Sequence, residues 1–173
     1  MITIETEYCN PISQVFYDNT VYSIDLATLS CTCGHFGCLI WYGSYSRRLR
    51  QGDSILLLRV ARVFCRSCGH SHALLLSSVV PYSQIPLPVQ ASIAQCYENG
   101  SGYQNILAYQ PLIDENTISS IIRSYRHHWQ ERIISAQLCL SSLRQLVRGC
   151  FALFSRPFMQ IKTTRNKLFL SPT

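Results

Sequence analysis

The chain has 173 residues, a formal net charge of +6 and 47% apolar residues, which suits one compact domain or two small ones that share a core. Its longest apolar runs, such as residues 55–58, are too short to span a bilayer. Because the first residues lack the basic and apolar regions of a signal peptide, we expect a cytoplasmic protein without a membrane partner.

Nine cysteines occur in the chain, and an odd number disfavours a complete set of disulfides. In a reducing compartment, clustered cysteines are more typical of metal ligands. Isolated cysteines behave as small buried apolar groups, and we expect this of Cys9, Cys96, Cys139 and Cys150.

Residues 1–30 are predicted to be a strand-like N-terminal extension. Aromatic and β-branched residues at 15–17 and 21–24 flank the turn-prone pair Asp18-Asn19. We assign no chemistry to this segment.

Residues 31–80 are predicted to form a zinc ribbon around a β-hairpin. Strand-like segments at 39–50 and 54–64 are joined by a turn at 51–53. The hairpin would bring the cysteines that precede it next to those that follow it. Zinc requires four donors in a tetrahedron, and two cysteine groups on tight turns can supply them.

The expected zinc ligands comprise one clear pair and one ambiguous group. Cys65 and Cys68 have the spacing of a zinc-ribbon turn, whereas three cysteines compete for the other two places. Cys33 and Cys38 fit that spacing better than Cys31 and Cys33, so Cys31 is the alternate ligand. We therefore expect one structural Zn²⁺ held by Cys33, Cys38, Cys65 and Cys68, with no open position for a reactive water.

Other interpretations of the cluster are a redox pair or incidental buried thiols. The neighbouring histidines are interpreted as exposed loop residues rather than ligands: His35, His70 and His72.

Arginine provides 13 of the 15 basic residues, because lysine occurs only at 162 and 167. Its planar fork suits phosphates and guanine edges. The hairpin carries an array that could follow a phosphate backbone, for which we expect the contacts to come from Arg47, Arg48, Arg50 and Arg62. The alternative is a solvated sheet face on which arginine stems cover aromatic rings.

Residues 88–132 are predicted to form a helix-turn-helix unit after a proline-containing linker at 78–87. Helices are expected at 88–98 and 103–109, and Asp114 would cap the next one. The last helix would bury isoleucines and turn small polar and basic side chains outward. Such a face suits entry into a DNA groove, and its expected contact residues are Asn116, Thr117, Ser119, Ser120, Arg123, Ser124 and His127. The alternative is a plain helical hairpin with a solvated face.

Residues 133–173 are predicted to continue as a long C-terminal helix followed by a basic tail. Apolar Leu140, Leu143 and Val147 could pair two copies into a homodimer or pack within one chain. The whole chain is thus expected to be an α+β protein, a zinc-ribbon β-hairpin followed by a helix-turn-helix domain and a long helix.

The order of these motifs resembles a known family. The motifs are the cysteine group at 31–38, Tyr42-Gly43-Ser44-Tyr45-Ser46-Arg47, Arg62-Val63-Phe64-Cys65-Arg66-Ser67-Cys68, His72-Ala73-Leu74-Leu75, Val80-Pro81-Tyr82 and the helix-turn-helix that ends at Trp129. This order is similar to the N-terminal zinc-finger and helix-turn-helix region of bacterial insertion-sequence transposases. It also resembles a family of small stand-alone proteins of unknown function from Gram-positive bacteria.

The resemblance covers roughly residues 30–132, and it implies binding to the terminal DNA of a mobile element. The first turn of those transposases has two residues between its cysteines, whereas one residue separates Cys31 from Cys33. This departure is the reason that the first pair of ligands stays open.

We expect no catalytic residues. Transposase chemistry needs separated carboxylates that hold two metal ions, and no acidic residue follows Glu131. A glycine-rich phosphate loop and a Gly-x-Ser-x-Gly elbow are also absent from the sequence. The chain is therefore predicted not to be an enzyme.

The leading hypothesis is a sequence-specific double-stranded DNA-binding protein derived from or associated with a mobile element. It would act as a regulator or as an accessory factor that binds the element's ends, with a protein partner from the same element. One alternative is an adaptor that docks onto a larger effector or nuclease. Another is a protein that binds structured RNA through its arginines and tyrosines.

Overall fold

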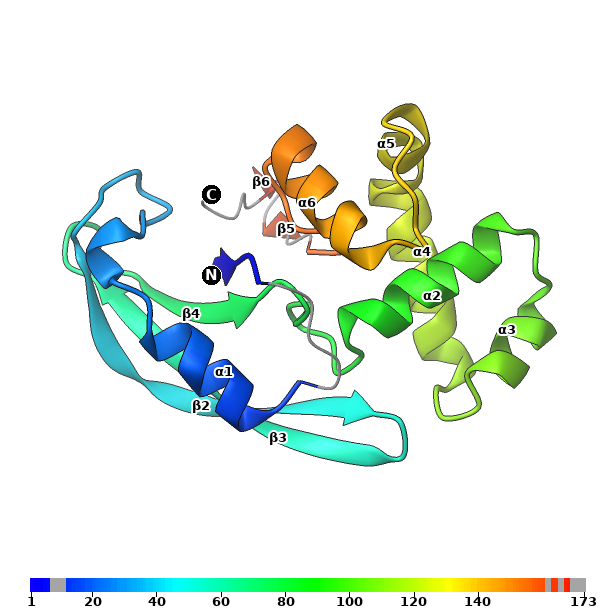
Figure 1. The fold of residues 1–173 in the computed structure, drawn as a ribbon, viewed down its shortest axis with the longest axis horizontal. Helices are drawn as coiled ribbons and strands as arrows, with labels where there is room; N and C mark the ends of the chain where they lie inside the picture. The colour runs from blue at the N-terminus through cyan, green and yellow to red at the C-terminus, as the bar shows by residue number, and fades with distance from the viewer. Residues whose placement is uncertain (7–11, 161–162, 165–166, 169–173) are drawn as a thin grey trace.

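The computed structural model describes residues 1–6, 12–160, 163–164 and 167–168. Within these residues the fold combines a four-stranded sheet with six α-helices, which confirms the α+β class (Figure 1). The sheet occupies the N-terminal half and the helices α2 to α6 the C-terminal half. No described helix is long and apolar enough to cross a membrane.

The sheet has the strand order β1-β4-β3-β2. Strand β3 (Ser54–Cys65) is antiparallel to both β2 (Leu39–Gln51) and β4 (Ser71–Leu76), while β1 (Ile2–Ile4) is parallel to β4. The predicted hairpin is therefore confirmed in β2 and β3. Its turn places Gly52 at φ 59°, a left-handed conformation that glycine adopts without steric cost.

The prediction of strand-like structure in residues 15–24 is wrong, because helix α1 (Gln14–Tyr22) forms there. Ser13 caps this helix by accepting a hydrogen bond from the backbone amide of Phe16. Tyr17 and Val21, one helical turn apart, are fully buried against the sheet. This burial at helical spacing outweighs the β propensity of the aromatic and β-branched side chains.

Side chains of helix α1 also form hydrogen bonds with backbone groups of the sheet. The Tyr17 hydroxyl donates to the Leu74 carbonyl at 2.8 Å and accepts from the Ala61 amide at 2.8 Å. Gln14 bonds to both backbone groups of Arg59. A short 3₁₀ helix, Leu26–Thr28, follows and leads into the cysteine loop.

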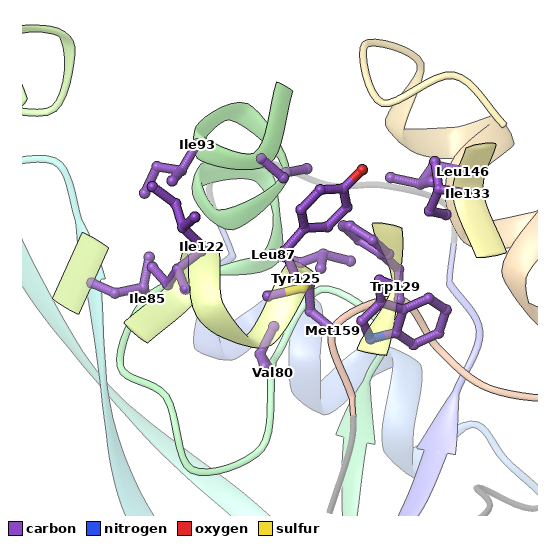
Figure 2. Close-up of a cluster of buried hydrophobic side chains, with 14 of the residues drawn as sticks. Val80, Ile85, Leu87, Ile93, Ile122, Tyr125, Trp129, Ile133, Leu146 and Met159 are labelled. Atoms are coloured by element: carbon purple, nitrogen blue, oxygen red, sulfur yellow. The ribbon is translucent and has the colours of Figure 1, made fainter. Parts of the chain in front are cut away.

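The helical half contains α2 (Leu87–Glu98), α3 (Tyr103–Tyr109), α4 (Glu115–His128), α5 (Gln130–Ser135) and α6 (Leu143–Phe154). Its core is shown in Figure 2, where Tyr125 and Trp129 lie among the aliphatic side chains. Both aromatic rings make edge contacts with Phe158, at centroid distances of 6.3 and 5.2 Å respectively.

The prediction of one long C-terminal helix is wrong. Helix α4 ends at His128, α5 is a single short segment, and α6 begins only at Leu143. The break lets Trp129 become fully buried and lets α6 fold back, so that Leu146, Val147 and Cys150 join the same core. Leu140 and Leu143 pack against this core within the chain. Short strands, Thr163–Thr164 and Lys167–Leu168, pair beyond α6.

The free end of the β2–β3 hairpin is joined to the helical half by arginines. Arg47 donates to the carbonyls of Val80 and Ser83. The Arg50 amide donates to the Gln84 carbonyl at 2.8 Å, and its guanidinium reaches the Leu112 carbonyl at 3.0 Å. These bonds connect the hairpin to the linker and to the turn between α3 and α4.

Candidate metal centre and nucleic-acid interface

Four cysteines converge at the end of the sheet opposite the hairpin turn. The Sγ atoms of Cys31, Cys33, Cys65 and Cys68 all lie within 4.8 Å of one another. Cys31 and Cys33 come from the loop before β2, whereas Cys65 and Cys68 come from the turn between β3 and β4. The hairpin therefore performs the predicted task of bringing the two cysteine groups together.

The sulfur separations fit a tetrahedral metal site. The Sγ atoms of Cys31 and Cys68 are 3.6 Å apart, and those of Cys33 and Cys65 are 3.8 Å apart. Both values far exceed the length of a disulfide bond. They match the edge of about 3.8 Å that a tetrahedron has when its metal–sulfur bonds are about 2.3 Å. The four side chains could thus hold one metal ion.

Two glycine turns set this geometry. The Gly34 amide donates to the Cys31 carbonyl at 2.8 Å, and the Gly69 amide donates to the Cys65 carbonyl at 2.9 Å. Both glycines have positive φ, 87° and 71°, which other residues adopt only with strain. Each turn folds the chain tightly enough for two cysteines to face the same point.

Cys38, expected as a ligand, lies outside this group, and the alternate ligand Cys31 takes its place. The physical reason is the turn at Gly34, which brings Cys31 and Cys33 onto one side despite their short spacing. Cys38 instead leads directly into β2, and its carbonyl accepts from the Arg66 amide. Its Sγ atom nevertheless lies 3.3 Å from that of Cys65, so a fifth thiol borders the group.

Two histidines lie against the cysteines. His72 is buried, not exposed as expected, and its Nε2 atom is 3.3 Å from the Cys31 Sγ atom. His35 is exposed, and its Nδ1 atom is 3.4 Å from the Cys33 Sγ atom. The apolar alternation of β4, in which His72 precedes Leu74 and Leu76, was the sequence pattern that could have indicated its burial.

The thiols differ in acidity within the described structure. Burial raises the pKa of Cys31 to about 12. Burial also acts to raise the pKa of Cys65, but hydrogen bonds from the Cys68 amide and neighbouring thiols outweigh it and lower that pKa to about 6. The amide and ring of His35 lower the pKa of Cys33. Cys65 and Cys33 thus have the strongest thiolate character, which is the form that binds metal.

The predicted phosphate-binding arginines are largely engaged within the protein. Arg47 and Arg50 bind backbone carbonyls as described above. Arg62 donates to the Ser71 hydroxyl and lies over the Tyr42 ring at 5.5 Å. Arg48 is exposed, and among the described residues it has no hydrogen-bond partner.

Helix α4 presents a polar stripe to solvent. Asp114 caps the helix by accepting from the Thr117 amide at 2.9 Å and from the Thr117 hydroxyl at 2.7 Å. Of the predicted contact residues, the half-buried ones are Thr117, Ser119 and Ser124, and the Ser119 hydroxyl bonds to Tyr103. The exposed ones follow helical spacing: Asn116, Ser120, Arg123 and His127.

Comparison with known proteins yields one partial similarity. No family model and no solved structure matches the chain. Over 102 residues the chain is 30% identical to ribosomal RNA small subunit methyltransferase E of a Synechocystis species. This alignment covers 51% of the chain and 33% of the methyltransferase, so the chain spans about a third of that relative's length. The resemblance to the transposase region stays a prediction.

The similarity corrects one expectation. Motifs absent from the sequence led to the prediction that the chain is not an enzyme. That prediction is overturned, because half of the chain is similar to part of a methyltransferase. The error arose because the absence of a catalytic motif argues only against the enzyme classes that carry that motif.

Proposed function

We propose that the chain is a zinc-stabilised protein that binds double-stranded DNA sequence-specifically and that derives from or accompanies a mobile element. The observation that carries this proposal is the exposed stripe of α4, in which Asn116, Ser120, Arg123 and His127 lie at helical spacing. Asparagine and arginine are the side chains that most often read adenine and guanine edges in the major groove. The stripe offers both on one helix.

Three features of the helical half support this proposal. The short α3 helix is followed closely by α4, and the turn at 110–114 joins the two. Ile106, Ile113 and Ile118 from these helices and their turn are buried in the core of the helical half. Helix α2 packs against α4. In a helix-turn-helix unit, α4 would then be the recognition helix, with α2 packed on its buried side.

We propose Zn²⁺ as the metal of the four-cysteine group. Four thiolates in a tetrahedron favour zinc. Structural zinc sites are almost always tetrahedral, and zinc forms strong bonds to cysteine sulfur. With all four positions taken by cysteine, the ion would brace the β2–β3 hairpin. The hairpin in turn contacts the α3–α4 turn through Arg50.

Selection from random DNA duplexes at near-physiological salt tests the proposal. We expect enrichment of one sequence, and we expect Arg123→Ala to relax the preference at one position of it. Arg59→Ala removes the same charge from an exposed site on β3 and should leave the preference unchanged. Absence of any enriched sequence would contradict the proposal.

Binding of structured RNA is a second candidate, and the similarity to a ribosomal RNA methyltransferase favours it. The same purified protein can be offered small-subunit ribosomal RNA in competition with duplex DNA. Preference for the RNA would favour this candidate. A labelled methyl donor added to the RNA reaction would test for methyl transfer directly.

A further inference from the structure

A concave surface lies between the β2–β3 hairpin, β4 and the segment at 82–84. This groove has a volume of about 760 Å³, within the range of sites that hold small organic molecules. Two tyrosines, Tyr45 and Tyr82, line it together with three arginines, Arg47, Arg48 and Arg62. Among the described residues that line the groove, none is acidic.

The backbone conformation at Tyr82 is held by its neighbours. Tyr82 has φ 61°, a left-handed conformation that is rare for a bulky side chain and that persists only where surrounding contacts impose it. Arg47 binds the Val80 and Ser83 carbonyls on either side of it. The Arg50 amide binds the next carbonyl, that of Gln84, at 2.8 Å. These bonds fix the segment while the Tyr82 side chain stays 72% exposed.

The arginines around the groove have different tasks. Arg47 donates to the Val80 and Ser83 carbonyls and so fixes the segment that carries Tyr82. Arg62 keeps its guanidinium at the groove by stacking over Tyr42 and bonding to Ser71, which leaves further N–H donors of its planar fork. Arg48 is exposed. The groove therefore offers cations at Arg48 and Arg62 beside the exposed aromatic rings of Tyr45 and Tyr82.

We propose that this groove binds a short single-stranded stretch of nucleic acid, with Tyr45 and Tyr82 stacking on bases and Arg48 and Arg62 contacting phosphates. Aromatic rings next to a positive groove are the combination that holds unpaired nucleotides. A duplex keeps its bases stacked inside and offers the tyrosines only its backbone. This site is separate from the α4 stripe and extends the proposed function to DNA or RNA whose strands have opened.

Fluorescence anisotropy with a labelled twelve-residue deoxythymidine oligonucleotide tests the site. We expect Tyr82→Ala and Tyr45→Ala each to weaken binding roughly tenfold, because each removes the aromatic ring on which one base would stack. Tyr45→Phe should bind as the wild type does, since stacking needs the ring and not the hydroxyl. Photocrosslinking with an oligonucleotide that carries 5-iodouracil should label Tyr45 or Tyr82.

Tyr22→Ala is the matched control, because Tyr22 is 53% exposed but lies on α1 outside the groove. An equal loss in Tyr22→Ala, or no binding of the oligonucleotide by the wild type, would overturn the proposal. Arg123→Ala should retain single-strand binding, whereas Tyr82→Ala should retain the duplex preference. The two sites can therefore fail independently.

Discussion

Single residues decide which cysteines meet at the candidate metal centre. Spacing along the chain favoured Cys38, but the left-handed turn at Gly34 brings Cys31 and Cys33 together instead. The pair Cys65 and Cys68 was predictable, because two intervening residues fit one tight turn. The choice in the first group depended on a backbone conformation that spacing alone does not specify.

The two candidate ligands can be separated by metal analysis. We expect Cys31→Ser to lose bound zinc, because it removes one corner of the tetrahedron. Cys38→Ser should keep stoichiometric zinc, because the remaining four thiols still form the group. Zinc per chain, measured by mass spectrometry after purification without added metal, distinguishes them. The opposite pattern would place Cys38 in the site.

Tyr17→Phe tests the hydroxyl that joins α1 to the sheet. The change leaves the Ala61 amide and the Leu74 carbonyl without the partner that both now share. We expect the free energy of unfolding to fall by about 1–3 kcal/mol, the usual effect of an unsatisfied buried polar group. Urea denaturation measures it. Tyr22→Phe, which alters an exposed ring, should change stability little, and an equal fall in both variants would refute the explanation.

At the scale of elements, local patterns predicted some helices and missed others. Helices were expected at 88–98 and 103–109, and the structure has Leu87–Glu98 and Tyr103–Tyr109, since proline and glycine mark these ends. The helix α1 and the break at Trp129 were missed. Both depend on burial against segments distant in the sequence, which local propensity does not report.

The cap of α4 gives a prediction that depends on pH. Hydrogen bonds from the Thr117 hydroxyl and amide lower the pKa of Asp114. A carboxyl whose pKa is lowered by folding stabilises the protein above its unfolded pKa of about 3.9. That contribution is lost as the pH falls through the folded pKa. Asp114→Ala should therefore reduce stability at pH 7.

The difference in melting temperature between wild type and Asp114→Ala should shrink as the pH is lowered below about 4. Thermal unfolding followed by circular dichroism at pH 7, 5 and 3 measures this. Asp53→Ala, at the exposed hairpin turn, serves as the control. A difference that stays constant down to pH 3 would show that the ionised cap is not its source.

At the scale of the molecule, the described residues form two hydrophobic cores, one under the sheet and one among the helices. The hairpin belongs to the first core and reaches the helical half through the hydrogen bonds of Arg47 and Arg50 at its turn, while the cysteine group lies at its other end. The sequence led us to expect that Arg47 and Arg50 bind phosphate, because it does not show their contacts within the protein. Only the tertiary structure shows that backbone carbonyls already occupy their guanidinium and amide groups.

If the four cysteines hold the proposed metal, its removal should affect the two halves unequally. A strong chelator is expected to lower the melting temperature, because metal binding contributes to folding free energy. Hydrogen exchange should quicken first at the amides of Cys31, Gly34 and Gly69, which form the cysteine turns. Amides of α2 and α4 should keep their protection. Uniform deprotection of the chain would instead indicate a single cooperative unit.

The position of β2 has a consequence for self-association. As one of the two outermost strands of the sheet, β2 presents an edge onto which a strand of another molecule could add. Charge lies along this edge at Arg47, Arg48 and Arg50, and the register shift between Trp41 and Gly43 twists it. The Arg50 amide already donates to the Gln84 carbonyl. Whatever ligand the protein binds, we expect these features to hinder edge-to-edge aggregation through β2, the longest strand among the described residues.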